Sequence, residues 1–347
     1  MASIAVARQA GVAAPNIRFE DVAAPARSAA IRWASDLRMR LERDFGERRM
    51  RHALAAAADG PEALRRSMQD TRALLHRFDR PVLPRVAAEA ARVPPPPGAP
   101  AAAGPAEWFE PRGERPRGIV MHVHGGAFIA SRSPRITRLV ARFGAAAGAS
   151  VFAPTYRLAP EHPCPAAIED IRAAWQWLRR ERPNERVVAL AESAGAAVLL
   201  AALQAERDQG ARLPDAVVLL SPFVDLTLQS LSVISASLTG SASFSMASMA
   251  LAARFYRGSL PADDARVSPL FGRFEKLPPM LIHTSRGDIL HDDALGLADR
   301  MRDAGGDLSV RIWEAETHVW ERMNGPEARR SIELAARFIE GHLTKNG

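Results

Sequence analysis

Short apolar segments alternate with amphipathic helical segments from residue 119 onward, and this alternation constrains the fold more than any other feature of the sequence. The apolar segments have no polar face, which is typical of strands in a parallel sheet covered by helices on both sides. We therefore expect an α/β architecture with a doubly wound, mostly parallel sheet. The expected strands are residues 119–123, 150–153, 186–191, 216–220, 280–284 and 308–313, and the expected helices are residues 136–147, 166–180, 194–208, 293–304 and 326–343.

The region before this alternation has a different character. Residues 1–30 show neither a helical nor a strand period, and we expect them to be loosely ordered. Apolar residues then recur at helical spacing over residues 31–45 and again over 64–78, which predicts two amphipathic helices that need a surface to pack on. The proline-rich residues 94–105 predict a stiff linker and mark the clearest domain boundary.

A second interruption lies inside the alternation. Residues 222–278 fit no strand pair, and residues 230–255 within them have a helical pattern. An insertion here could join the N-terminal helices as a lid. We therefore expect a helical cap segment with its linker in residues 1–100 and a catalytic domain in 101–347, with a cap insertion at about 222–278.

Composition excludes several classes of protein. Apolar residues make up 47% and charged residues 24% of the chain, which is typical of a globular protein. The net charge is +7, but the arginines are interleaved with acidic residues and form no basic stripe, so we expect no nucleic-acid partner. The single cysteine, Cys164, excludes an intrachain disulfide, and we expect it to be inert. No apolar run is long enough for a signal peptide or a membrane span, which predicts a soluble, cytoplasmic protein.

Ser193 lies where an expected strand runs directly into an expected helix. Small residues surround it in the sequence Ala191-Glu-Ser-Ala-Gly195, as they do in a nucleophile elbow, although Ala191 stands where that motif usually has glycine. A buried serine at a helix N-cap is the alternative interpretation. Upstream, the strand 119–123 ends in His124-Gly-Gly-Ala-Phe128, and glycines at this place allow backbone N–H groups to point into a cleft. Such groups, with the N–H of Ala194, could stabilise an oxyanion.

A nucleophilic serine needs a base and an orienting carboxylate. Asp288 follows the strand 280–284, and His318 follows the strand 308–313. The order Ser193, Asp288, His318 is that of an α/β-hydrolase, with all three residues after strand ends on one edge of the sheet.

Other assignments remain open. Asp292 or Asp293 could orient the histidine in place of Asp288. His283 and His291 adjoin the acid and are expected to be structural or exposed. His122 and His124, two residues apart on a strand, have the spacing of a metal pair, but no further ligand cluster follows them, so we expect no metal.

These motifs resemble those of the hormone-sensitive-lipase-like family of α/β-hydrolase esterases, from about residue 105 onward. The four motifs that carry the resemblance are residues 124–128, residues 156–162, residues 192–195, and Asp288 followed by His318. The resemblance implies that Ser193 is the nucleophile, that His318 is the general base and then acid, and that Asp288 orients it. It also implies a helical cap over the site and a bracing role for residues 156–162.

The sequence departs from this family at two positions, because Ala127 and Ala191 replace the usual glycines. An N–H survives each change, but the added methyl narrows the space. We expect the oxyanion donors to be Gly125, Gly126 and Ala194, with Ala127 as an alternative to Gly125.

The expected function is hydrolysis of a small to medium carboxylic ester through an acyl-enzyme on Ser193, without cofactor or metal. The expected partner is a small-molecule ester, and the protein is expected to be a monomer or homodimer. An acyltransferase, a lactone-forming enzyme or an amidase would use the same residues, and a non-catalytic receptor could use the same fold.

Overall fold

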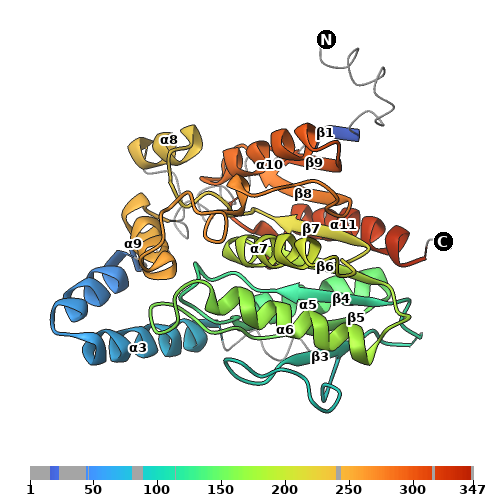
Figure 1. Cartoon of the computed structure of the whole chain (residues 1–347), viewed down its shortest axis with the longest axis horizontal. Helices are drawn as coiled ribbons and strands as arrows, with labels where there is room; N and C mark the ends of the chain where they lie inside the picture. The colour runs from blue at the N-terminus through green and yellow to red at the C-terminus, as the bar shows by residue number, and fades with distance from the viewer. Residues whose placement is uncertain are drawn as a thin grey trace, which may run out of the picture.

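A largely parallel sheet forms the centre of the computed structural model (Figure 1), which describes residues 16–22, 44–45, 47–79, 89–113, 115–239, 244–314 and 317–344. Within these residues the sheet has nine strands in the order β1-β9-β8-β7-β6-β4-β5-β3-β2, and only the pairings of β3 and β2 are antiparallel. The predicted doubly wound sheet is confirmed. The strands are β1 (Asn16–Val22), β2 (Ala91–Val93), β3 (Glu107–Glu110), β4 (Ile119–Val123), β5 (Ser150–Ala153), β6 (Val187–Glu192), β7 (Ala216–Leu220), β8 (Met280–Ser285) and β9 (Asp307–Trp313).

Helices cover both faces of this sheet because alternate residues of its buried strands point to opposite sides. In β4, Met121 belongs to the core beneath α6 (Ala166–Glu181), α7 (Ala194–Asp208) and α10 (His291–Asp303), whereas Val120 belongs to the core beneath α5 (Pro134–Ala147) and α11 (Pro326–Thr344). Residues 47–58 are also helical. The longer helices are α3 (Pro61–Asp79), α5 (Pro134–Ala147), α6 (Ala166–Glu181), α7 (Ala194–Asp208), α8 (Leu231–Thr239), α9 (Met246–Arg257), α10 (His291–Asp303) and α11 (Pro326–Thr344), and two 3₁₀ helices are η2 (Pro269–Phe271) and η3 (Trp320–Arg322).

The N-terminal region differs from the expectation of loose order over residues 1–30. Residues Asn16–Val22 form β1, which pairs in parallel with β9 at the edge of the sheet. Most of β1 is exposed, and only Val22 is fully buried, so the strand has no hydrophobic alternation that a sequence pattern could reveal. An ion pair of 2.9 Å between Glu20 and Arg311 adds to the backbone pairing.

The proline-rich residues 94–105 connect β2 to its antiparallel neighbour β3. The boundary expected at residue 101 thus lies inside a connection between two strands, and both β1 and β2 belong to the sheet. The helix expected over 64–78 is confirmed as part of α3, whereas most of the helix expected over 31–45 lies outside the described residues.

Helices α8 and α9 lie in the segment expected to be an insertion. Figure 1 shows them at the same end of the molecule as α3. In the described part of the chain, no helix combines the length and apolar character that a membrane span requires.

Candidate active site

Ser193 occupies a tight turn between β6 and α7. Its φ of 52° is in the left-handed region that non-glycine residues rarely adopt, which indicates backbone strain at this position. The turn is close to the end of β4, because a Cβ atom on Gly195 would lie 2.3 Å from the carbonyl oxygen of Val123. Only glycine fits at that point. The methyl of Ala191 is fully buried within the core, so the sheet accommodates this departure from the usual motif.

Asp288 and His318 meet at the ends of β8 and β9. The Nδ1 atom of His318 lies 3.1 Å and 3.3 Å from the two carboxylate oxygens of Asp288, and both residues are buried. Burial alone would raise the pKa of Asp288, but His318, the Ser221 hydroxyl and the N–H of Leu290 outweigh it and hold the pKa below its usual value. The buried acid is therefore a carboxylate that fixes the orientation of the imidazole.

The two alternative acids contact other groups. Asp292 accepts the N–H of Ser232 at the start of α8, over 2.8 Å. Asp293 accepts the N–H groups of Val224 and Asp225, over 2.7 and 3.0 Å. Both carboxylates thus attach the 222–278 segment to α10, and the structure brings Asp288 to the histidine.

Ser193 and His318 follow parallel strands and lie at the same edge of the sheet. Among the described residues, no hydrogen bond joins the Ser193 hydroxyl to His318. Hydrogen bonds between nucleophile and base are often long in the absence of substrate and shorten in the substrate complex.

The oxyanion loop, which we define as residues 124–130, corrects one expectation. The N–H of Gly125 donates to Oε1 of Glu192 over 2.7 Å and is not available to a substrate. In the described part of the chain, no acceptor contacts the N–H groups of Gly126, Ala127 or Ala194. The available donors are therefore those three, with Ala127 in the place expected for Gly125.

Two neighbouring elements support the oxyanion loop. The hydroxyl of Tyr156 donates to the carbonyl oxygen of His124 over 2.7 Å, and the two rings stack with centroids 4.2 Å apart. Burial lowers the pKa of His124 to about 3, so the ring is neutral, and its Nδ1 lies 2.7 Å from the carbonyl oxygen of Gly125.

The second support of the oxyanion loop comes from α3. Arg72 donates to the carbonyl oxygen of Ile129 and forms a two-pronged ion pair with Glu161.

Three contacts of the site had no signal in the sequence. The fully buried Ser221 hydroxyl accepts the N–H of Val319 over 3.2 Å and hydrogen bonds with Asp288. Phe244 contacts the His318 ring edge-on, with ring centroids 5.2 Å apart. Glu192, next to the nucleophile, lies between the oxyanion loop and His122. Ser221 and Phe244 are residues of ordinary type that distant parts of the chain bring to Asp288 and His318, whereas Glu192 belongs to the 192–195 motif, which does not reveal its partners.

The remaining candidate residues have structural surroundings. His122 contacts Glu192, His283 contacts the Ser331 hydroxyl, and His291 lies 3.4 Å from the Thr284 hydroxyl. Within the described residues, no three potential ligand side chains come close enough to hold a metal ion. Burial raises the pKa of Cys164 to about 11, which leaves its thiol protonated at neutral pH.

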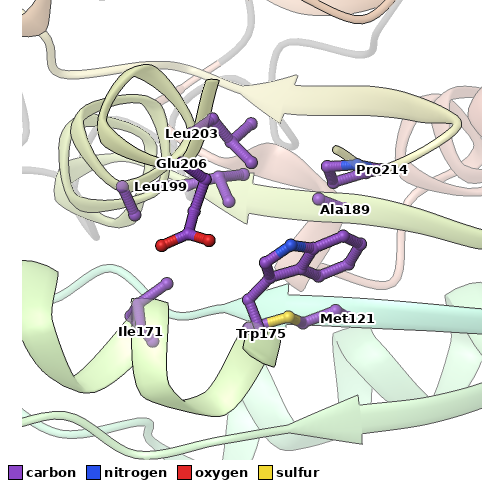
Figure 2. Close-up of a pocket in the computed structure, with 9 residues that line it drawn as sticks. Met121, Ile171, Trp175, Ala189, Leu199, Leu203, Glu206 and Pro214 are labelled. Atoms are coloured by element: carbon purple, nitrogen blue, oxygen red, sulfur yellow. The ribbon is translucent and has the colours of Figure 1, made fainter. Parts of the chain in front are cut away.

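A small pocket between α6, α7 and the sheet shares no residue with this site. Figure 2 shows the carboxylate of Glu206 and the indole of Trp175 facing it among apolar side chains. Glu206 is paired with Arg172 over 2.7 Å, so the pocket contains no unpaired charge from this residue. The lining is Met121, Ile171, Trp175, Ala189, Leu199, Ala202, Leu203, Glu206 and Pro214.

Comparison with known proteins agrees with this geometry. The model of a family described by its alpha/beta hydrolase fold matches residues 120–322. An acetyl-hydrolase of Streptomyces hygroscopicus is 36% identical over 67% of this chain and 79% of its own length. An esterase of Acinetobacter venetianus is 28% identical over 63% of this chain and 74% of its own length.

Solved structures extend the comparison to a larger share of the chain. An esterase of the bacterial hormone-sensitive lipase family has a TM-score of 0.68 and 27% identity, with 86% of this chain and 98% of that one covered. The structure of EstE5 soaked with p-nitrophenyl butyrate has a TM-score of 0.68 and 28% identity over 78% of this chain and 92% of its own. The chain therefore belongs to the α/β-hydrolase fold family and, within it, to the hormone-sensitive-lipase-like esterases.

Proposed function

We propose that this protein is a serine carboxylesterase that hydrolyses small to medium esters through an acyl-enzyme on Ser193. The observation that carries the proposal is the buried Asp288–His318 pair at the ends of β8 and β9, on the sheet edge where Ser193 occupies a strained turn. An acetyl-hydrolase among the relatives and a structural neighbour soaked with a butyrate ester support acyl groups of two to four carbons.

In this mechanism the substrate carbonyl oxygen lies against the N–H groups of Gly126, Ala127 and Ala194. His318 accepts the proton of the Ser193 hydroxyl through Nε2 as the oxygen attacks the carbonyl carbon. The three donors stabilise the negative charge that develops on the carbonyl oxygen.

Collapse of the tetrahedral intermediate completes acylation. The C–O bond to the alcohol breaks, and His318 returns its proton to that oxygen. Water then attacks the acyl-enzyme, with His318 again as base, and releases the acid and Ser193. Asp288 holds the imidazole with its proton on Nδ1 and stabilises the imidazolium in both steps.

The same proposal assigns the cap to the helical residues 47–79 together with residues 222–278. Arg72 attaches α3 beside the oxyanion loop, and Phe244 attaches the insertion to His318. Such a cover would exclude water and strengthen the hydrogen bonds to the oxyanion.

The test is turnover of p-nitrophenyl esters from acetate to octanoate by the wild type and by Ser193→Ala. We expect the variant to lose at least about three orders of magnitude in kcat without loss of thermal stability. A fluorophosphonate should label Ser193 in the wild type. Retention of a tenth of the activity, or labelling elsewhere, would contradict the proposal. An added alcohol that captures most of the acyl group would instead identify an acyltransferase.

A further inference from the structure

Glu192 immediately precedes Ser193, and its side chain reaches the neighbouring strand β4 and the residues that follow it. Glu192 is only 2% exposed, so its carboxylate is buried away from water. A buried carboxylate needs hydrogen-bond donors, and Glu192 has two. Oε1 accepts the N–H of Gly125 over 2.7 Å, and Oε2 lies 2.5 Å from Nε2 of His122.

The geometry explains why this carboxylate reaches both partners. β4 and β6 are adjacent, with Val123 paired to Ala191, so the residues that follow these two also lie close together. A Cβ atom on Gly125 would lie 2.8 Å from the carbonyl oxygen of Glu192, which places the oxyanion loop directly against the nucleophile turn. The Glu192 side chain bridges the two elements at this contact.

The hydrogen bonds also define the proton arrangement. Nδ1 of His122 is buried without a partner. A proton at that atom would be a buried donor with nothing to bond, so the ring carries its proton on Nε2 and donates it to Glu192. One oxygen of the Glu192 carboxylate thus accepts a hydrogen bond from His122, and the other accepts the N–H of Gly125.

We propose that Glu192 is a positioning residue that sets the oxyanion hole: by binding the N–H of Gly125, it fixes the loop so that the N–H groups of Gly126 and Ala127 face the reacting carbonyl. The proposal rests on the proposed esterase function. Glu192 does not touch substrate, and its effect is transmitted through the backbone of one glycine.

The test compares Glu192→Ala with Glu192→Gln in the full chain. Glutamine has the same length and can still accept from Gly125, but it carries no charge. We expect Glu192→Ala to lose about 100-fold in kcat, comparable to the loss of one oxyanion donor, with KM within about twofold of wild type. Glu192→Gln should retain kcat within about fivefold, because the hydrogen bond to Gly125 survives.

Glu206→Ala is the matched control. Glu206 is equally buried and also has two hydrogen-bond donors, here the side chains of Arg172 and Gln176, but it lies in α7 beside the pocket of Figure 2. We expect this variant to lose thermal stability while its kcat stays unchanged. If Glu192→Ala does not fold, Glu192→Asp replaces it, because a side chain shorter by one methylene cannot bridge His122 and Gly125.

A second readout isolates the oxyanion hole. A trifluoromethyl ketone forms a tetrahedral adduct whose oxyanion needs the same donors, so Glu192→Ala should weaken its inhibition in proportion to the loss of kcat/KM. Equal losses of kcat in Glu206→Ala and Glu192→Ala, or in Glu192→Gln and Glu192→Ala, would overturn the inference, the latter in favour of a charge effect. Normal Ser193 labelling without any loss in Glu192→Ala overturns the inference alone, whereas a wild type that neither labels nor turns over esters overturns the proposed function and the inference with it.

Discussion

The Ser221 hydroxyl links the loops that carry the acid and the base, and its removal gives a sharp test of the site. Ser221 directly follows β7, is fully buried, and has a φ of 45°. Its N–H donates to the carbonyl oxygen of His283 over 2.8 Å in β8. Its hydroxyl accepts the N–H of Val319, one residue after His318, and hydrogen bonds with the Asp288 carboxylate. Ser221 therefore links the end of β7 to β8 and to the segments that follow β8 and β9.

The size of the effect of Ser221→Ala follows from these two bonds. The buried N–H of Val319 would lose its acceptor, which costs about 1–3 kcal/mol of the free energy of unfolding. The hydrogen bond to the Asp288 carboxylate is worth about 1.5–3 kcal/mol, as is usual for a charged partner. If loss of the hydrogen bond to Asp288 raises the activation free energy by its full value, kcat falls about 10- to 150-fold, because 1.36 kcal/mol corresponds to a factor of ten.

The assay measures kcat, KM and the melting temperature for Ser221→Ala, Ser221→Gly and Ser268→Ala. Ser268 is the matched control: it is fully buried, its hydroxyl accepts the N–H of Leu226 over 2.7 Å and donates to the carbonyl oxygen of Ala262 over 2.6 Å, and it does not contact the triad. Glycine adopts the positive φ of this position without strain, but it lacks the hydroxyl. Both Ser221 variants should therefore lose kcat to the same extent. An active Ser221→Gly, or an equal loss of kcat in Ser268→Ala, would refute the role of this hydroxyl.

Three further outcomes are expected. Asp288→Asn should lower kcat by about 10⁴-fold, whereas Asp292→Asn should lower only the melting temperature, since its carboxylate caps α8; an equal loss of kcat in both would contradict the assignment of the acid. Arg72→Ala, by releasing α3 from Ile129 and Glu161, should lower the melting temperature and reduce turnover of octanoate more than of acetate, and an unchanged chain-length profile would separate α3 from the cap. The pKa of His124 falls from 6.5 to about 3 on folding, so its neutral form contributes stability that is complete above pH 6.5 and is lost as the pH falls toward 3. Over this pH range the melting temperature should therefore drop less in His124→Gln than in the wild type. Parallel curves of melting temperature against pH would contradict this.

The sequence predicted the positions of the three candidate catalytic residues because strand ends are defined by apolar patterns. Once β6, β8 and β9 are recognised as parallel strands of one sheet, Ser193, Asp288 and His318 must lie at one edge, whatever the details of the loops. The strand β1 escaped the same reasoning because an exposed edge strand is held by backbone pairing, which leaves no pattern in the side chains.

The supporting contacts could not be predicted because they depend on which N–H group is already bonded. Gly125 and Gly126 are chemically identical in the sequence, and only the Glu192 carboxylate, 67 residues further along the chain, distinguishes them. Ser221 likewise reaches Val319 across 98 residues. A serine, a glutamate or a glycine has many uses in a protein, so its type carries no information about such a distant partner.

The oxyanion loop shows why so many contacts converge on it. Gly126, Ala127 and Phe128 are consecutive residues with positive φ angles of 110°, 52° and 65°. For Ala127 and Phe128 this conformation costs about 1–2 kcal/mol each, and an unsupported loop would relax to negative φ. Relaxation would rotate the peptide groups, and the N–H groups of Gly126 and Ala127 would no longer point in one direction.

The contacts around the oxyanion loop oppose that relaxation at each of its parts. Glu192 holds the N–H of Gly125, Tyr156 holds the carbonyl oxygen of His124, and Arg72 holds the carbonyl oxygen of Ile129. Phe128 is fixed by stacking on Tyr256 of α9, with ring centroids 3.9 Å apart. These anchors come from β6, the segment after β5, α3 and α9, so the strained donors depend on the central sheet and on both proposed parts of the cap. A cap that detached would therefore weaken the oxyanion hole as well as admit water, and substrate cover and catalytic power would be lost together.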